Sequence, residues 1–309
     1  MNIEPIIKLE PAFKDYLWGG TKLRDIYHKN CDFDIIAESW ELSAHPDGTC
    51  IVASGRLKGL PFTEYLKKVG NSVLGTKYDI NKEFPLLIKF IDAKQNLSVQ
   101  VHPNDEYALK NENGYGKTEM WYVIDAEQGA GLYVGFNCDV SKEEVAQRIA
   151  DNTIMEVLDF HPTKPGDVFF IPAGTVHAIG AGNLICEIQQ SSNSTYRLYD
   201  YDRRDKYGNP RELHLAKALD VLNYKKYEPI TFNGNVKCKY FDVSFVDVVD
   251  KQRIMLTKES FYSITCIKGS GNLILGDIVP INSGETTFIP ATDNFLTVEG
   301  NVSLVITKI

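Results

Sequence analysis

Long hydrophobic runs are absent from this chain of 309 residues. No stretch approaches the roughly 18 consecutive apolar residues that a membrane-spanning helix needs. The first residues, MNIEPIIKLEP, also lack the basic segment and the apolar core of a secretory signal peptide. Basic charge is in deficit as well, with 33 Lys and Arg against 41 Asp and Glu, so the net charge of −8 does not suit binding to a phosphate backbone. We therefore expect a cytoplasmic protein that binds neither membranes nor nucleic acids.

Paired cysteines are also missing. None of the six cysteines forms a CxxC pair, so the spacing fits neither a disulfide framework nor a thiolate zinc site. We expect all of them to be small buried side chains, as free cysteines usually are. They are Cys31, Cys50, Cys138, Cys186, Cys238 and Cys266. Any metal must then be bound by imidazole, carboxylate or amide groups.

Short segments rich in Val, Ile, Phe and Tyr recur between Gly, Pro, Asn and Asp, which is typical of β-strands. The predicted strands are 85–93, 97–102, 119–124, 131–136, 167–172, 240–249, 261–267, 272–276, 285–290 and 302–307. Helical periodicity is confined to short segments, which are 61–69, 103–111, 141–152 and 214–223. In one of these, Ser141 and Glu144 have the spacing of a capping box. The pattern predicts a mainly β protein with a barrel and short helical insertions.

An internal repeat indicates two copies of one β unit. The segment GDVFFIPAGTVH at 166–177 is similar to GETTFIPATDNF at 284–295. His177 of the first copy corresponds to Phe295 of the second, so we expect a metal site in the first copy alone. The expected domains are a metal-binding domain at 1–230 and a C-terminal β domain without metal ligands at 231–309.

The first copy of the repeat has the pattern G-x5-P-x-G-x2-H, which resembles the second sequence motif of the cupin superfamily. The glycine turns a hairpin, a strand follows, and the proline and second glycine shape the turn that aims His177 inward. One departure is Ala181, where the superfamily has an asparagine. That position is commonly structural, so we keep His177 as a candidate metal ligand.

The other candidate ligands lie on two earlier strands. In LSVQVH, alternation places Ser98, Gln100 and His102 on one face, which we expect to point into the barrel. Unpaired polar groups in an interior cost about 1–3 kcal/mol each, and a bound cation would satisfy Gln100 and His102 together. Glu119 occupies the place of the cupin glutamate ligand. Two imidazoles, a carboxylate and an amide oxygen suit Zn²⁺, although Fe²⁺, Mn²⁺ and Co²⁺ remain open.

Longer motifs resemble the short bacterial form of the type I mannose-6-phosphate isomerases. They are DYLWGG at 15–20, QVHP at 100–103, GKTEMWYV at 116–123, PAGTVHAIGAG at 172–182 and EIQQSSNSTYRLYDYDR at 187–203. The resemblance covers most of 1–223, with a weaker match of 235–309 to the accessory second cupin of the family. It implies a cupin-type barrel, or jelly roll, and one Zn²⁺ per chain. It also implies Gln100, His102, Glu119 and His177 as the zinc ligands, and Arg197 as a catalytic residue.

The implied reaction moves a proton between C2 and C1 of a sugar phosphate through an enediol. A zinc ion with an open position would polarise the substrate oxygens. Glu187 is our first candidate for the base, because it lies ten residues after His177 on the expected next inward strand. Arg197 and Lys117 would stabilise the enediolate or the phosphate.

Three further residues are candidates for substrate binding. Lys89 is the one basic residue within the apolar strand 85–93, and a buried ammonium must be paired or near water, so we expect it to face the cavity. Ser98 shares the polar face with the proposed ligands. Trp18 either stacks on the sugar or closes the barrel. Lys89 and Lys117 have a purely structural alternative in an ion pair, and Arg197 has a surface ion pair as its alternative.

Two other classes of function remain open from the residues. A cupin oxygenase would use Fe²⁺ and usually has a His-x-His pair, which Gln100 interrupts. A non-catalytic sugar-binding bicupin would be expected to lose its ligands, whereas the first copy retains them. The partner we expect is a small phosphosugar substrate. A homodimer of the chain is possible.

Overall fold

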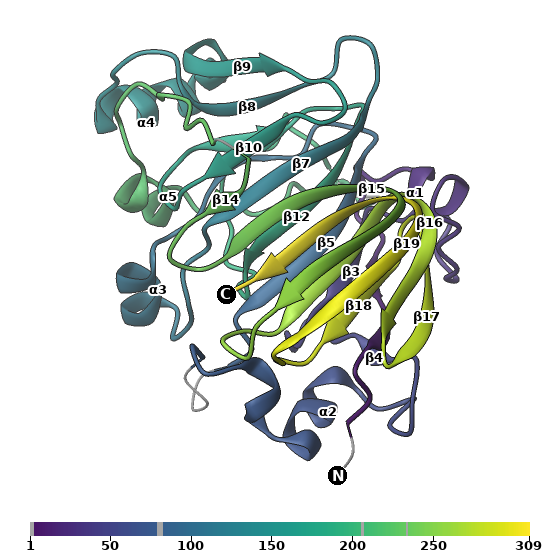
Figure 1. Ribbon diagram of the computed structural model, residues 1–309. Helices are drawn as coiled ribbons and strands as arrows, with labels where there is room; N and C mark the ends of the chain where they lie inside the picture. The colour runs from purple at the N-terminus through teal and green to yellow at the C-terminus, as the bar shows by residue number, and fades with distance from the viewer. Residues whose placement is uncertain (1–2, 79–82, 205–206, 233) are drawn as a thin grey trace.

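The computed structural model describes residues 3–78, 83–204, 207–232 and 234–309. Its strands form three antiparallel sheets, connected by short helices (Figure 1). The helices are α1 (Lys22–Asp25), α2 (Phe62–Val69), α3 (Asp105–Asn111), α4 (Lys142–Ala150) and α5 (Leu215–Val221), with 3-10 turns η1 (Asn71–Leu74) and η2 (Ile154–Val157). The predicted mainly β, cupin-type architecture is confirmed.

Two of the sheets build the first barrel. The six-stranded sheet has the order β10-β7-β12-β5-β3-β2, and the five-stranded sheet has the order β13-β6-β11-β8-β9. The strands of the first are β2 (Ala12–Lys14), β3 (Glu38–Leu42), β5 (Leu86–Ala93), β7 (Glu119–Ala126), β10 (Val168–Ile171) and β12 (Asn183–Gln190). The strands of the second are β6 (Val99–Val101), β8 (Gly131–Phe136), β9 (Leu158–Pro162), β11 (His177–Ile179) and β13 (Tyr196–Tyr199).

The inner faces of these two sheets share one hydrophobic core. Val123 of β7 and Ile185 of β12 belong to the same buried cluster as Leu132 and Val134 of β8. Their burial removes apolar surface from water and holds the sheets face to face. The cavity described below therefore has rigid walls on both sides.

The third sheet forms most of the C-terminal β region and has the order β14-β15-β19-β16-β18-β1-β4, with β17 paired to β16. Its strands are β1 (Ile7–Glu10), β4 (Ile51–Val52), β14 (Val236–Lys237), β15 (Asp242–Leu256), β16 (Tyr262–Leu275), β17 (Asp277–Asn282), β18 (Thr286–Ile289) and β19 (Asn294–Lys308). The segments 261–267 and 272–276, predicted as two strands, lie in the single long strand β16. A register shift between Cys266 and Lys268, followed by Gly269 at φ 81°, lets β16 bend while it stays paired with β19.

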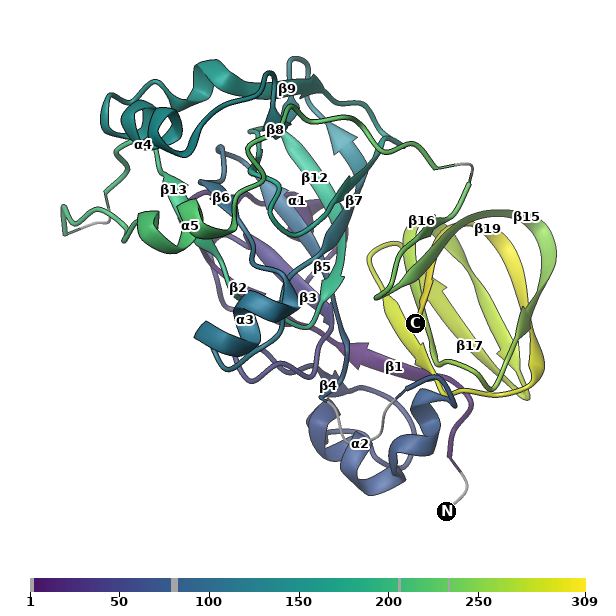
Figure 2. The ribbon, with the colours of Figure 1, turned by 90° about the vertical axis from the view of Figure 1, so that its left-hand side faces the viewer.

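The N-terminal strand crosses to the C-terminal region. β1 runs between the two regions (Figure 2). It pairs with β18, through Ile7 opposite Phe288, and also with β4. An aromatic cluster fills the space between the two regions, with Phe288 in contact with Phe62, Phe84 and Phe261 at ring-centroid distances of 5.1 to 6.5 Å. The chain is therefore joined by a shared sheet and a shared core.

Local details modify the sequence predictions. Ser141 caps α4 by accepting a hydrogen bond from the Glu144 amide at 3.1 Å, but the Glu144 carboxylate binds Arg148, so half of the predicted capping box forms. The prediction of six buried cysteines is wrong for Cys138, which is exposed in the loop after β8, and for the half-buried Cys31 and Cys238. Among the described residues, no helix is long and apolar enough to cross a membrane.

Candidate active site

The polar side chains of β6 lie at the centre of the candidate site. Gln100 is paired with His177 of β11 on one side and with Arg197 of β13 on the other. Ser98 and His102, on the same face, are buried. The intervening side chains, Val99 and Val101, point to the other face and are buried in a hydrophobic cluster. Strand pairing therefore brings together three residues that are far apart in the sequence.

Glu119, the first residue of β7, completes a cluster with the two histidines. Its Oε1 lies 3.3 Å from Nε2 of His177, and its Oε2 lies 3.5 Å from Nε2 of His102. One ligand atom from each of these three residues lies within 4.8 Å of the others, and all three side chains are buried. This is a candidate metal centre formed by residues that the sequence predicted.

Backbone hydrogen bonds orient both imidazole rings. Nδ1 of His102 donates to the carbonyl oxygen of Ser194 at 2.8 Å, and Nδ1 of His177 donates to that of Thr175 at 2.9 Å. The protons are thereby placed on Nδ1, and the Nε2 lone pairs face Glu119, as outer hydrogen bonds do at metal-binding histidines. Burial lowers the pKa of both rings, that of His177 to about 4, so the neutral form that binds metal is favoured.

The donor set fits a divalent cation. Both oxygens of the Glu119 carboxylate are buried, and Oε1 has no hydrogen bond from the described part of the chain. Burial raises its pKa to about 8 against the opposing effect of Lys117, whose Nζ lies 2.9 Å from Oε2. The Gln100 amide lies 3.2 Å from Nε2 of His177, and a half-turn of that amide presents its oxygen instead. A cation would satisfy the remaining carboxylate oxygen, Oε1, which is costly to bury without a partner.

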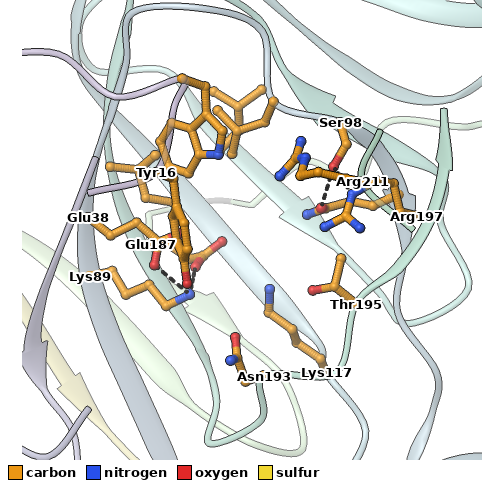
Figure 3. Close-up of a pocket in the computed structure, with 15 residues that line it drawn as sticks. Tyr16, Glu38, Lys89, Ser98, Lys117, Glu187, Asn193, Thr195, Arg197 and Arg211 are labelled. Carbon is orange, nitrogen blue, oxygen red and sulfur yellow. Dashed lines mark hydrogen bonds and ion pairs between the residues drawn. The ribbon is translucent and has the colours of Figure 1, made fainter. Parts of the chain in front are cut away.

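A cavity of about 270 Å³ lies beside this cluster. Figure 3 shows the side chains that line it. It is lined by Tyr16, Trp18, Glu38, Lys89, Ile91, Leu97, Ser98, Gln100, Lys117, Ile179, Glu187, Asn193, Thr195, Arg197 and Arg211. Gln100 and Lys117 belong to the lining and also contact the cluster, so they connect the cavity to the candidate metal centre. Four cationic side chains against two carboxylates make the cavity suited to an anionic ligand.

Lys89 and Glu187 are directly opposite each other on β5 and β12. Nζ of Lys89 lies 3.3 Å from Oε2 of Glu187 and 3.6 Å from Oε2 of Glu38. Lys89 therefore lines the cavity, as expected. It also forms the ion pairs with carboxylates that a purely structural role would require. Burial alone would raise the pKa of Glu187, but Lys117 and Lys89 lower it to about 2, so this carboxylate is ionised.

Two tryptophans hold the carboxylates in this part of the cavity. Nε1 of Trp121 donates to Oε1 of Glu187 at 2.9 Å, and Nε1 of Trp40 donates to Oε2 of Glu38 at 2.6 Å. Glu187 and Trp121 are opposite each other on adjacent strands. Each carboxylate is thus fixed by one indole and one ammonium group, which leaves little rotational freedom.

The opposite side of the cavity holds two arginines (Figure 3). Nε of Arg197 donates to Oγ of Ser98 at 3.3 Å, and its Nη1 donates to the carbonyl oxygen of Glu212 at 2.7 Å. Nε of Arg211 donates to Oδ2 of Asp200 at 2.7 Å. Burial and the nearby Arg211 lower the pKa of Arg197. An anionic ligand bound beside Arg197 and Arg211 would relieve this repulsion between like charges.

Several lining residues were missed by the sequence reasoning. Arg211 and Glu38 reach the cavity through tertiary contacts, and no local motif marks them. The indirect signal for Arg211 is Asp200, which looks like part of a surface charge run but is buried between Arg203 and Arg211. Trp18 is also buried at the cavity, whereas Tyr16, in ring contact with it at 5.6 Å, is the more exposed.

Comparison with known proteins identifies the family. The model of the catalytic domain of type I phosphomannose isomerase matches residues 6–129, and that of the cupin domain of mannose-6-phosphate isomerase matches residues 232–309. A mannose-6-phosphate isomerase of Bacillus subtilis is 39% identical over 94% of this chain and 94% of its own length. The chain belongs to the type I phosphomannose isomerase family.

Further members of the family agree with this assignment. A mannose-6-phosphate isomerase of Streptococcus mutans is 43% identical over 72% of this chain and 69% of its own length. The crystal structure of a mannose 6-phosphate isomerase from Bacillus subtilis superimposes with a TM-score of 0.90 at 37% identity, covering 99% of this chain and 100% of that one. The family resemblance seen in the sequence motifs is thereby confirmed.

Proposed function

We propose that this protein interconverts mannose 6-phosphate and fructose 6-phosphate in the cavity beside the His102–Glu119–His177 cluster, with one bound Zn²⁺. Its place in the family makes it an aldose–ketose isomerase. The observation that carries the metal proposal is the buried Glu119 carboxylate. Its Oε1 has no hydrogen bond within the described residues, and its two oxygens lie 3.3 and 3.5 Å from the Nε2 atoms of His177 and His102.

The proposed ligands are His102, Glu119, His177 and the amide oxygen of Gln100. Two nitrogen donors, one carboxylate and one amide oxygen suit Zn²⁺, and Fe²⁺, Mn²⁺ and Co²⁺ are the alternatives that this donor set also accepts. When bound, the cation would act as a Lewis acid toward the carbonyl and hydroxyl oxygens of the substrate. Lys117, in contact with Glu119 and His102, would hold its ammonium group beside the same oxygens.

We assign anion binding to the arginine side of the cavity. Arg197 and Arg211 offer planar guanidinium groups that can donate two parallel hydrogen bonds to a phosphate or to the oxygens of an enediolate. Ser98 holds Arg197 in place, and Asp200 holds Arg211. The two arginines would thus fix the phosphosugar before proton transfer begins.

We assign the proton transfer between C2 and C1, through an enediol, to Glu187. The carboxylate faces the cavity and is ionised, so it can accept a proton. A carboxylate whose pKa is about 2 is a weak base, so transfer to it requires a C–H bond made acidic by polarisation of the neighbouring carbonyl. Lys89 and Trp121 would keep the group oriented as it gains and loses the proton, while Trp18 packs at the wall of the cavity.

We further propose that residues 1–230 form the catalytic unit, that residues 231–309 form an accessory β region, and that the active species is a homodimer. Light scattering coupled to size-exclusion chromatography tests the last point. A mass near 35 kDa, that of the single chain, would contradict the homodimer.

The test of the function is removal and return of the metal. The protein is treated with EDTA, desalted and assayed with mannose 6-phosphate before and after addition of Zn²⁺, Fe²⁺, Mn²⁺ or Co²⁺. We expect activity to disappear and to return with Zn²⁺. Activity that survives complete metal removal, verified by elemental analysis, would contradict the metal proposal. Oxygen consumption dependent on Fe²⁺ would support an oxygenase, and sugar binding without turnover would support a binding protein.

A further inference from the structure

One carboxylate joins the C-terminal β region to the segment that precedes β7. Oη of Tyr240, which lies between β14 and β15, donates to Oδ2 of Asp105 at 2.8 Å. Oδ1 of Asp105, at the start of α3, accepts a hydrogen bond from the backbone amide of Gly116 at 3.1 Å. Tyr240 is outside the lining of the catalytic cavity. The contact therefore reaches the site indirectly, through the backbone next to Lys117.

Gln190 makes a second connection from the same carboxylate. Its Nε2 donates to Oδ1 of Asp105 at 2.9 Å, and its Oε1 accepts a hydrogen bond from the Thr118 amide at 2.9 Å. Its own backbone amide donates to the Thr118 carbonyl oxygen at 3.1 Å. Gln190 is buried, and both ends of its side chain amide are used. Asp105 thus fixes Gly116 directly and Thr118 through one intermediate side chain.

The segment 116–118 is tightly seated and carries side chains of the site. The Lys117 amide donates to the carbonyl oxygen of Pro103 at 3.0 Å. A Cβ added to Gly116 would lie 2.5 Å from the backbone nitrogen of Asp105, so the two backbones are in close contact. Nζ of Lys117 then reaches Oε2 of Glu119 at 2.9 Å and Nε2 of His102 at 3.1 Å. A displacement of this segment would therefore move a side chain that touches two of the proposed ligands.

We propose that Tyr240 is a positioning residue for the isomerase reaction, acting through Asp105 to hold the segment 116–118 and with it Lys117 and Glu119. The proposal rests on the function proposed above and gives the C-terminal β region a part in it. Hydrogen bonds to a charged acceptor are about twice as strong as those between neutral groups. Removing the tyrosine hydroxyl leaves Lys239 as the partner of Asp105 Oδ2 within the described residues. Its ammonium group lies 3.4 Å away on a largely exposed side chain, so it restrains the carboxylate more weakly.

The test compares Tyr240→Phe with Tyr122→Phe in the full-length protein. The Tyr122 ring stacks on Phe245 of the C-terminal region with a ring-centroid distance of 5.1 Å, so its variant removes a tyrosine hydroxyl at a different contact between the two regions. For Tyr240→Phe we expect kcat to fall about tenfold, as for outer residues of metal sites, with KM nearly unchanged. We also expect faster release of Zn²⁺ to a chromogenic chelator and faster amide hydrogen exchange at residues 116–118. Tyr122→Phe should match the wild type in all four measurements.

A second pair of variants establishes the route. In an Asp105→Ala background, or in Asp105→Asn if the alanine variant does not fold, the additional effect of Tyr240→Phe should vanish. Unchanged kcat and unchanged exchange at 116–118 in Tyr240→Phe would overturn the proposal, as would an effect that persists in full without Asp105. Amide exchange does not depend on catalysis. An inactive wild type would therefore refute the proposed function, while the exchange measurement would still test the positioning contact.

Discussion

Replacement of Glu187 by glutamine separates its proposed chemical role from its structural role. The amide has nearly the same shape as the carboxylate, and its oxygen can still accept the 2.9 Å hydrogen bond from Trp121. The variant loses the ability to take up a proton and loses the ion pair with Lys89 at 3.3 Å. General base catalysis typically contributes about 10²- to 10⁴-fold, so we expect kcat to fall within that range.

The structure also sets the expected loss of stability. Removing the sole partner of a buried charge costs about 3–5 kcal/mol, but Lys89 keeps Glu38 at 3.6 Å. We therefore expect a loss of about 2 kcal/mol, which corresponds to a fall in Tm of about 4–8 °C. Calorimetry measures this loss, and an assay below the transition measures kcat on folded protein.

Glu38→Gln is the matched control, because it neutralises the other carboxylate beside Lys89 and leaves the 2.6 Å hydrogen bond from Trp40 available. The two variants should lose similar stability, whereas Glu187→Gln should lose far more activity. If Glu187→Gln retained near wild-type kcat, or if both variants lost activity equally, the assignment of Glu187 as the base would be refuted.

Three further predictions address the metal, the anion and the folded state. Glu119→Gln removes the one anionic ligand of the proposed set, so elemental analysis should find Zn²⁺ well below one per chain; full occupancy would contradict the ligand assignment. Arg211→Ala removes a charged hydrogen-bond donor, worth about 1.5–3 kcal/mol, so KM for mannose 6-phosphate should rise about 10- to 100-fold at unchanged zinc content, and an unchanged KM would exclude substrate contact. Asp200→Asn should reduce the free energy of unfolding at pH 7. Burial opposes ionisation of Asp200, but hydrogen bonds from Arg211 and Arg203 lower its pKa, so its contribution is fully present above the unfolded pKa of about 3.8 and is lost as pH falls through the lower folded value. Urea titrations should therefore show a constant gap between variant and wild type from pH 5 to 8 and a shrinking gap below about pH 4.

Much of the metal centre could be predicted because the signals are local. Alternation along β6 placed Gln100 and His102 on one face, and the turn residues before His177 indicated its inward direction. The sequence could not show the register between strands, which places Gln100 opposite both His177 and Arg197. That register follows from packing of the whole barrel, since a slip by one residue would turn the polar face of β6 into the core.

Glu38 and Arg211, which also line the cavity, were less predictable for the same reason. Glu38 comes from β3, about 60 residues before β6, and meets Lys89 only because β3 and β5 are neighbours in the sheet. Arg211 was hidden in a charged segment that resembles an exposed surface. Asp200 distinguishes the two cases, because a carboxylate buried between two guanidinium groups holds them in fixed positions, which an exposed ion pair does not.

The internal repeat correctly predicted a pair of equivalent strands, but the two residues that it aligns after them, His177 and Phe295, have different environments. β10 and β18 occupy equivalent positions of the repeat, Val168–Ile171 and Thr286–Ile289. His177 is buried in its barrel, but Phe295 at the start of β19 is 46% exposed, so alignment of the two residues does not give them equivalent environments. A short sequence repeat preserves the strand and its turn, whereas the direction of the following side chain depends on how the next strand bends.

The two equivalent strands have different neighbours, which makes the C-terminal half of the chain depend on the N-terminal strand. β10 lies at the end of its sheet, whereas β18 lies between β16 and β1, so the edge that is terminal in the first barrel is covered by the N-terminal strand in the second. An uncovered edge presents unpaired backbone groups that favour aggregation. Cutting the chain at the predicted boundary after residue 230 would expose this edge of β18 and, with it, the contact of Phe288 with Phe62 and Phe84. The boundary therefore divides two sequence repeats, but it also cuts through a hydrophobic cluster that both regions share.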